Sequence, residues 1–411
     1  MFSAIGMPFV GSIFANSTNA FIRTLKVFRL EVRKPCMRRG LSDLSVVSFE
    51  ELKQLVEINS YTWNKEGVDT HGLLFSEWIQ EIGYSEVRYP RETIGDHLLF
   101  RSSFIEGQKR VLLLGHLDTV FPPGSFEQFD EDDEWVYGPG VCDMKGGNLI
   151  ALQALRAVHQ TAGGIANIDF LLVSDEEKGS DDSTSLTQSL ALDYDICLDF
   201  EAAGPNHEVV IARKGIGTFE FTVEGLAAHA GNHYADGVDA NRIAAELLLE
   251  LVQLTDLEQG TTVNPGKISG GIGANTISPK AEITVEVRFT KPSERDRVLT
   301  SFEELAAREW ASGAKVILSG RLQRDVMEPN RNQSELLYEI AEVLGYPLPT
   351  ERRGGVSDAN TVAALGVATL DGFGPFGDGD HSVKERALKT SFQRRLSEVT
   401  RILMQFNQFG L

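Results

Sequence analysis

The amino-acid sequence predicts an α/β fold: a mostly parallel sheet covered by helices, into which a smaller α+β domain is inserted. Short apolar runs alternate with helical stretches in the first half of the chain, and they lie at residues 110–115, 168–174 and 195–200. Such runs are typical of strands buried on both faces of a parallel sheet. From about Lys214 the strands instead alternate polar and apolar residues, as in "KAEITVEVRF", which indicates a sheet with one wet face.

The domain boundaries follow from where these two patterns begin and end. The folded part is expected to start near Ser48, because Ser48 and Glu51 have capping-box spacing ahead of apolar residues. We expect the larger domain over residues 45–213 and 323–411, and the inserted domain over residues 214–322. Further helices are expected at residues 148–159, 241–254, 294–307, 335–344 and 391–406.

The composition is that of a globular protein with an acidic surface. Apolar residues make up 42% of the chain, charged residues make up 24%, and the formal net charge is −20. Such a charge repels nucleic acid and anionic membranes, so neither is expected as a partner. The cysteines Cys36, Cys142 and Cys197 lack C-x-x-C spacing, which argues against a disulfide framework and a thiolate zinc site. A reducing, cytoplasmic compartment is expected.

Residues 1–44 form an N-terminal extension of the opposite charge. The first forty residues hold seven Lys or Arg against one Glu, a balance of +6. The positive charges follow a weakly apolar start, which argues against a secretory signal, and polar residues 16–19 interrupt the apolar part, which argues against a membrane span. We expect a disordered extension, with an organelle transit segment or a start codon placed too far upstream as alternatives.

Acidic and imidazole side chains follow directly after each apolar run. His116 and Asp118 follow the first run, Glu176 and Glu177 the second, and Glu201 the third. The carboxyl ends of parallel strands meet at the ligand crevice of an open α/β sheet. Crowded carboxylates repel one another, and a pair of divalent cations resolves this conflict, because carboxylate and neutral imidazole are normal ligands of catalytic zinc. Of the two adjacent glutamates, Glu177 suits a metal and Glu176 is then free to act on water.

Each motif taken alone also has a purely structural interpretation. His116 can be a histidine satisfied at a strand end, the acidic run at residues 175–178 can be an exposed turn, and Asp143 in "GPGVCDMKGG" can cap the following helix. Glu201 and His381 can belong to polar loops. Asp118, however, has the spacing that lets a carboxylate hold the second nitrogen of a metal-bound His116. Together the five candidate ligands form a pattern that is far more specific than any one of them.

These residues resemble those of a known superfamily, the di-zinc amidohydrolases that include aminoacylase, succinyl-diaminopimelate desuccinylase, acetylornithine deacetylase and carboxypeptidase G. The resemblance covers about residues 45–408 and looks closest to the glutamate carboxypeptidase branch. The matching segments are "GHLDTV", "GPGVCDMKGG", "SDEEKGS", "LDFEAAG", "AAHAGNHYADGVDA", "GGIGANTIS", "VEVRF", "GGVSDAN" and "GDGDHSVKE".

The resemblance implies two divalent metal ions per subunit. It implies that Asp143 bridges them, with His116 and Glu201 on one ion and Glu177 and His381 on the other. Zinc is the expected metal, with cobalt or manganese as alternatives. A cis peptide bond is expected after Asp143.

The resemblance also assigns the remaining site residues. It implies that Glu176 is the general base and that His229 in "AAHAG" reaches into the active site of a neighbouring subunit, and Asp118, expected to hold His116, is counted with them as a catalytic residue. The inserted domain is then a lid and dimerisation domain, and a homodimer is expected. Asn275 and Arg288 resemble residues that hold the scissile oxygen and the substrate carboxylate, although an exposed Arg at the end of an alternating strand is also common.

The expected activity is metal-dependent hydrolysis of an amide or peptide bond beside a free carboxylate. The substrate is a small molecule or a short peptide. Deacylation of an N-acyl amino acid stays open as an alternative, as does a non-catalytic homologue. After "FEAAGPNHEVVIARKG" the chain lacks the lysine that the carboxypeptidase G type has for a glutamate side chain, so a preference for glutamate is not implied.

Overall fold

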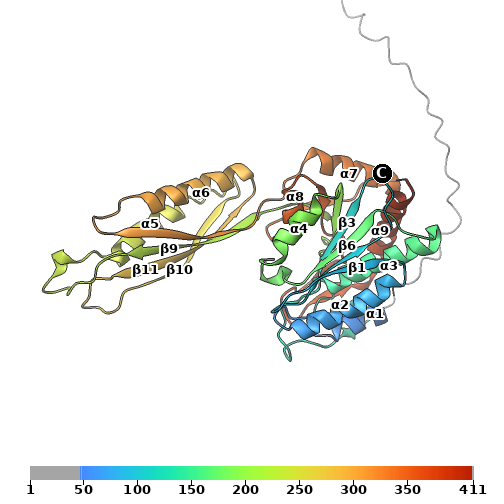
Figure 1. Ribbon diagram of the computed structural model, residues 1–411, viewed down its shortest axis with the longest axis horizontal. Coiled ribbons are helices and arrows are strands. Elements are labelled where there is room, and N and C mark those ends of the chain that lie inside the picture. The colour runs from blue at the N-terminus through green and yellow to red at the C-terminus, as the bar shows by residue number, and fades with distance from the viewer. Residues whose placement is uncertain (1–46, 48, 410–411) are drawn as a thin grey trace, which may run out of the picture. The chain divides into compact units, whose positions relative to one another are not determined.

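A computed structural model describes residue 47 and residues 49–409. It confirms the predicted α/β class, since a six-stranded, mostly parallel sheet lies at the centre of the larger part (Figure 1). In spatial order its strands are β1 (Ser85–Tyr89), β2 (His97–Arg101), β6 (Ile168–Val173), β3 (Val111–His116), β7 (Ile196–Asp199) and β14 (Ala368–Leu370). The last four are parallel, whereas β1 and β2 pair antiparallel at one edge. The apolar runs did not predict this edge, because β1 ("SEVRY") is polar. The extension over residues 1–44, Cys36 and the capping Ser48 lie outside the described residues.

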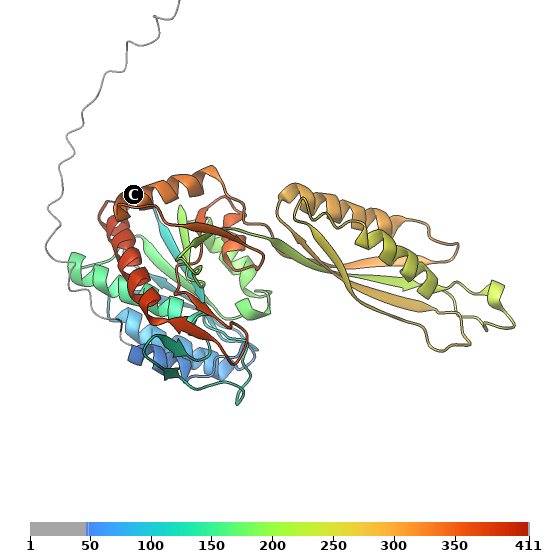
Figure 2. The same ribbon diagram turned by 180° about the vertical axis from the view of Figure 1, so that it is seen from behind.

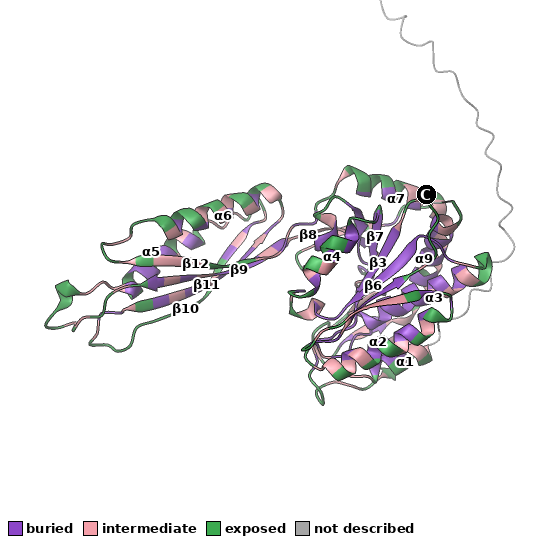
Figure 3. Ribbon diagram, in the orientation of Figure 1, coloured by how far each residue is buried: buried purple, intermediate pink, exposed green. Residues whose placement is uncertain are grey.

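Helices cover both faces of this sheet (Figures 1 and 2). Successive residues of β3 point to opposite faces: Val111 and Leu113 pack with α1, α2, α3 and α9, whereas Leu112 and Leu114 pack with α4 and α8. All residues of β3 and β6 are buried (Figure 3), which explains why these strands are continuous apolar runs in the sequence. The helices are α1 (Phe49–Val56), α2 (Lys65–Gln80), α3 (Lys145–Ala162), α4 (Ser183–Ala191), α7 (Arg331–Leu344), α8 (Ala359–Ala363) and α9 (Lys389–Phe409).

The strand register aligns the carboxyl ends of the three central strands. His116, the last residue of β3, pairs with Val173, the last residue of β6. Leu114 pairs with Asp199, the last residue of β7. The segments that follow β6 and β7 therefore begin beside His116.

The inserted part is a four-stranded antiparallel sheet with two helices. Its strands have the spatial order β10 (Thr262–Gly270), β11 (Lys280–Phe289), β9 (Gly215–Glu224) and β12 (Lys315–Arg324), and its helices are α5 (Ala240–Val252) and α6 (Pro292–Ala307). Buried residues alternate along β9 and β11, and they pack with both helices into a second apolar cluster. A short 3-10 helix, η2 (Tyr234–Asp236), lies between β9 and α5.

Two small sheets complete the larger part. One pairs β8 (Val209–Arg213) with β13 (Thr350–Arg353), and the other has the order β15 (Gly377–Asp378), β16 (Arg386–Leu388), β5 (Trp135–Tyr137) and β4 (Asp130–Glu131). The pairing of β16 with β5 brings two loops together, one after β5 and one before β16. None of the helices in the described part of the chain is long and apolar enough to cross a membrane.

Gly147 shows how closely α3 approaches the end of β7. A Cβ atom on Gly147 would lie 1.9 Å from the carbonyl oxygen of Phe200, so that the helix or the strand end would have to move. Alanine stabilises a helix by about 0.5–1 kcal/mol relative to glycine, but overpacking costs about 1–3 kcal/mol. We therefore expect Gly147→Ala to lower the free energy of unfolding, measured by urea titration.

Gly164, just after α3, is the control, because a Cβ atom there meets nothing within 4 Å. Gly164→Ala should change the free energy of unfolding by less than about 0.5 kcal/mol, as is usual for surface substitutions. Equal stability of the two variants would contradict the close approach of α3 to β7.

Candidate metal centre

The five predicted metal ligands come from five different segments of the larger part. His116 ends β3, Glu177 lies in the 3-10 helix η1 (Glu176–Lys178) after β6, and Glu201 lies two residues beyond β7. Asp143 lies in the loop between β5 and α3, and His381 lies in the loop between β15 and β16. The parallel strands therefore position three of these side chains, and the small sheet positions the other two.

Asp143 lies between two histidines, one at each carboxylate oxygen. Its Oδ1 is 3.1 Å from His116 Nε2, and its Oδ2 is 3.3 Å from His381 Nε2. His116 Nε2 is also 3.7 Å from Glu201 Oε1, and His381 Nε2 is 3.0 Å from Glu177 Oε2. The contacts thus divide the five side chains into two groups that share Asp143, which is the division that the resemblance implies. The peptide bond between Asp143 and Met144 is cis, as expected.

This set of donors fits a pair of divalent cations. When the shared Asp143 is counted in both groups, each group offers one imidazole nitrogen and two carboxylates. This number fits catalytic zinc, which normally takes three protein ligands and leaves one position open. One aspartate can bridge two ions about 3.5–4 Å apart. Ligand atoms of His116, Asp143 and Glu177 lie within 4.8 Å of one another, as do those of His116, Glu176 and Glu201. The individual ligand roles stay a prediction.

The electrostatics of the cluster favour the same interpretation. Burial, with the nearby Asp143 carboxylate, raises the pKa of Glu177 to about 8, and it also raises the pKa of Glu201. Hydrogen bonds to Asp143 and Glu177 raise the pKa of His381 to about 11. Burial disfavours the charged form of Asp143 as well, but hydrogen bonds from His116 and His381 hold its pKa below the usual range. The cluster thus contains more carboxylate than two imidazoles can neutralise, and divalent cations supply the missing positive charge.

Asp118 connects His116 to the two glutamates. His116 Nδ1 lies 2.9 Å from the backbone oxygen of Asp118 and 3.4 Å from its Oδ1, so the carbonyl rather than the predicted carboxylate is the nearer partner. The buried carboxylate instead accepts hydrogen bonds from Thr62 Oγ1 and from the backbone N–H groups of Glu176 and Glu177. Because the Nδ1–H is engaged, His116 Nε2 is left as the nitrogen that faces the other ligands.

Glu385 supports the loop that carries Asp143, and the sequence did not reveal this. Its side chain is buried, and its carboxylate accepts hydrogen bonds of 3.0 Å from the backbone N–H groups of Gly140, Cys142 and Asp143. Glu385 also lies four residues after His381 in "GDGDHSVKE". The only signal was its place in that motif, which does not tell a buried glutamate from one in a polar loop.

His381 itself is held less tightly than the other ligands. Its side chain is 58% exposed, and its backbone has a φ of 60°. This left-handed conformation costs a residue with a Cβ atom about 1–2 kcal/mol. Strain of this kind is typical of functional sites.

His229 and Asn275 lie together at one end of the inserted sheet. The backbone N–H of Ala230 donates to the carbonyl oxygen of Asn275, and His229 forms an isolated bridge with Thr276. Both side chains are exposed. The loop that carries His229 follows Glu224, the last residue of β9. The ten residues of β9 therefore separate this loop from the point where the chain enters the inserted sheet.

Arg288 lies near the opposite end of the same sheet. It pairs with Ile216, whereas Lys280 at the other end of β11 pairs with Glu224. Its Nη1 donates to the carbonyl oxygen of Gly354, and its Nε donates to Glu286. Asn275 and Arg288 were both expected to hold the substrate, yet residues 280–287 of β11, about 26 Å at 3.3 Å per residue, lie between their positions.

Comparisons with known proteins agree with this architecture. A family model described as "Peptidase dimerisation domain" matches residues 211–314, and one described as "Peptidase family M28" matches residues 102–246. Carboxypeptidase G2 of Pseudomonas sp. (strain RS-16) is 29% identical over 377 residues, which cover 89% of this chain and 91% of that protein. Succinyl-diaminopimelate desuccinylase of Xanthomonas oryzae pv. oryzae (strain MAFF 311018) is 29% identical over 316 residues, which cover 70% and 81%. The crystal structure of aminopeptidase PepT from Bacillus cereus ATCC 10987 has a TM-score of 0.74 at 19% identity and covers 89% of this chain and 98% of that one, a likeness of fold.

The fold and the site define a metal-dependent hydrolase, with carboxylates and histidines clustered at the carboxyl edge of a parallel sheet. With the matches above, they show that the chain resembles the metal-dependent peptidases and amidohydrolases that include carboxypeptidase G2 and succinyl-diaminopimelate desuccinylase. The resemblance predicted from the sequence is confirmed.

The contacts of Glu385 generate a prediction about metal affinity. In Glu385→Gln, an amide oxygen at the Oε1 position can still accept from Cys142 and Asp143, but the amide NH2 then faces the N–H of Gly140, so that two donors meet. We expect metal affinity to fall about 10–100-fold, the usual effect of losing a group that orients a ligand. Competition with a chelator of known affinity measures it.

The matched control is Asp378→Asn in β15, the strand next to β16. Asp378 is about half exposed and pairs with Arg386 at the surface. Its substitution should leave metal affinity unchanged. An unchanged affinity in Glu385→Gln would show that the Asp143 loop holds its position without this carboxylate.

Proposed function

We propose that this enzyme hydrolyses an amide or peptide bond next to a free carboxylate of a small molecule or short peptide. The observation that carries the proposal is the position of Asp143 between two histidines, with Glu177 and Glu201 completing two groups of donors. Zinc is the proposed metal, with cobalt or manganese as alternatives. The name of carboxypeptidase G2, a relative over most of the chain, supports cleavage beside a carboxylate.

Glu176 is the proposed general base. The five predicted ligands would hold the divalent cations, which when bound would lower the pKa of a water and polarise the carbonyl oxygen. Glu176 takes the proton of that water as the water attacks the carbonyl carbon, and it returns the proton to the leaving nitrogen when the C–N bond breaks. Its position supports this role, because the backbone N–H groups of Glu176 and Glu177 both donate to Asp118. Glu177 lies 3.0 Å from His381 Nε2, whereas the carboxylate of Glu176 lies near His116 and Glu201 and forms its ion pair with Arg324.

The inserted part supplies the remaining groups in this proposal. Arg288 anchors the substrate carboxylate by a charge-assisted pair, which sets the scissile bond in register with the centre. His229 and Asn275 donate hydrogen bonds to the developing oxyanion. The chain thus holds the carboxylate anchor and the oxyanion donors at opposite ends of one sheet.

Deacylation of an N-acyl amino acid is the second candidate, favoured by the match to a desuccinylase. A panel of dipeptides and N-acyl amino acids, each offered as a free acid and as a C-terminal amide to the metal-loaded enzyme, distinguishes the two reactions. The similarity to relatives that are named as enzymes weighs against a non-catalytic homologue. A cytoplasmic location is proposed as well, because Cys142 and Cys197 are both free and buried.

Glu176 and Glu177 are adjacent but have different proposed roles, and substitutions can separate them. Glu176→Gln should keep both metals and lose about 10²–10⁴ in kcat, the size of general-base catalysis. Glu177→Gln should lose metal, and excess zinc should restore part of its activity. Metal analysis and steady-state kinetics on both variants test this. Metal loss in Glu176→Gln, with recovery by zinc, would mean that the two roles are exchanged.

A homodimer is proposed because His229 begins far from its own metal centre. β9 starts at Gly215, directly after β8 of the larger part, and its ten residues extend about 30 Å before the loop of His229. The match of residues 211–314 to a peptidase dimerisation model supports pairing through this part. His229 of one subunit then completes the active site of the other.

Mixing two inactive variants tests this arrangement. Homodimers of His229→Ala and of Glu176→Gln should both be nearly inactive, whereas a heterodimer has one site with Glu176 and an incoming His229. After reversible dissociation and mixing, activity should return to about one quarter of wild type, because half of the dimers are mixed and half of their sites are complete.

His233→Ala is the control variant, since His233 is exposed in the same loop and pairs with Asp236. His233→Ala should stay active without mixing. Failure of the mixed dimers to recover activity, despite proven subunit exchange, would place His229 outside the partner's site.

A further inference from the structure

Arg324 carries a buried positive charge at the junction between the two parts of the fold. It is the last residue of β12, where the chain leaves the inserted sheet, and its side chain is 0% exposed. Burying a charged group costs several kcal/mol unless partners compensate it. The partners of Arg324 therefore show what the fold gains from this charge.

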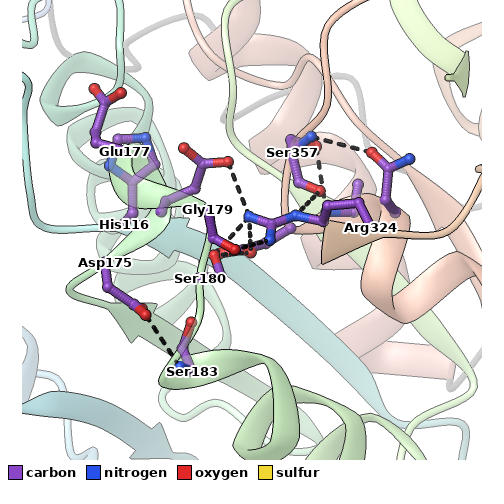
Figure 4. Close-up of polar contacts among 12 residues, drawn as sticks. His116, Asp175, Glu177, Gly179, Ser180, Ser183, Arg324 and Ser357 are labelled. Carbon is purple, nitrogen blue, oxygen red and sulfur yellow. Dashed lines mark hydrogen bonds and ion pairs between the residues drawn. The ribbon is translucent and has the colours of Figure 1, made fainter. Parts of the chain in front are cut away.

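The guanidinium contacts two segments of the larger part, residues 176–180 and residues 357–358. Figure 4 shows it between Gly179, Ser180 and Ser357. Its contacts are Nε to Ser357 O at 3.0 Å, Nη1 to Gly179 O at 2.6 Å, and Nη2 to Ser180 Oγ at 2.5 Å, Asp358 Oδ1 at 2.9 Å and Glu176 Oε1 at 3.2 Å. Such a fork fixes direction as well as charge, because guanidinium donors are rigid and planar.

Arg324 is the group that fixes the carboxylate of Glu176. In the part of the chain that the structure describes, that carboxylate has Arg324 as its one side-chain hydrogen-bond partner. Its other constraint is on the backbone, whose N–H donates to Asp118. One carboxylate oxygen of Glu176 also lies within 4.8 Å of ligand atoms of His116 and Glu201. Without Arg324 the carboxylate can rotate relative to this cluster.

We propose that Arg324 is a positioning residue for the reaction: it binds Oε1 of Glu176 and leaves the other oxygen free for the reacting water. Because Arg324 ends β12, it also ties the orientation of Glu176 to the inserted part. This inference rests on the proposed role of Glu176 as general base. It assigns Arg324 no contact with substrate.

Two other roles make different demands on the same contacts. A purely structural clip needs the bonds to Ser357, Gly179 and Asp358 but not the bond to Glu176. Asp358 also accepts a hydrogen bond from Ser180 Oγ at 2.6 Å, so part of this clip persists without Arg324. To anchor a substrate, the guanidinium of Arg324 would have to be accessible to the substrate carboxylate. Arg324 is buried and already binds two carboxylates, so its contacts do not fit this role.

The test compares kcat, KM, metal content and melting temperature for Arg324→Ala, Arg324→Lys and both substitutions in the Glu176→Gln background. Arg324→Ala should lower kcat about 10²-fold, since a misplacement near 1 Å can cost that much, and Arg324→Lys should lose less. KM should stay within about twofold, and both metals should remain bound. In the Glu176→Gln background, removal of Arg324 should cost little more, because the group that it positions is already inactive. If Arg324→Ala fails to fold, Arg324→Lys decides by the same criteria.

Arg321→Ala is the matched control. Arg321 lies three residues earlier on β12 and pairs with Asp181 of the same loop, but it is more than half exposed and does not contact Glu176. It should behave like wild type. If Arg321→Ala loses as much activity as Arg324→Ala, the loss comes from weakening the contact between β12 and the loop and not from the bond to Glu176. That result would overturn the inference.

The remaining outcomes separate this inference from the proposed function. A raised KM with unchanged kcat would make Arg324 a substrate anchor, and full additivity with Glu176→Gln or loss of metal would make it a structural residue. Each result overturns the inference and leaves Glu176 as the base. A fully active Glu176→Gln variant overturns the proposed function itself, and with it the role of Arg324.

Discussion

Repulsion among carboxylates is the constraint on which the site depends. Asp143, Glu176, Glu177 and Glu201 lie at one edge of the sheet, with His116, His381 and the buried Arg324 and Arg213 as nearby basic groups. Two unit charges 4 Å apart interact by about 4 kcal/mol at an effective dielectric constant of 20, so such a cluster is costly for the fold unless cations are bound. The strand register that creates this crowding also aligns the ligands of the cations. In the proposed metal centre, folding and metal binding would therefore be coupled through the same residues.

Buried charged groups behind the ligands hold this arrangement in place. Asp118 accepts from the backbone of Glu176 and Glu177, and Glu385 accepts from the backbone around Asp143. Arg324 binds the side chain of Glu176. Each of these three groups forms hydrogen bonds with a segment that carries a proposed ligand or the proposed base. The loops after β5 and β6 therefore keep their positions, although they belong to no large sheet. Hydrogen bonds from buried carboxyl and guanidinium groups thus hold the loops of the centre in place.

The sequence predicted the parts of the site that follow from periodic patterns. His116, Glu177 and Glu201 directly follow strands that are buried on both faces, and parallel topology requires such positions to meet. Asp143 and His381 lie in loops that meet through the pairing of β5 with β16, and no periodic pattern reveals that pairing, so the family motifs alone indicated them. Glu385 and Arg324 gave no usable signal, because a charged residue in a polar loop or at the end of an alternating strand is usually exposed. Whether such a residue is buried depends on partners that lie far away in the sequence.

The inserted sheet has different chemistry at its two ends. At the end where β12 returns to the larger part, Arg324 contacts Glu176 and Arg288 contacts Gly354, so both side chains reach the larger part of their own chain. At the other end, His229 and Asn275 are exposed, and in the proposed dimer they contact the other subunit. The strand that leads to the loop of His229, β9, and the strand that ends at Arg324, β12, are hydrogen-bonded neighbours in this sheet. In the proposed dimer, one sheet therefore carries both the group that reaches the partner's site and the group that binds the proposed base of its own site.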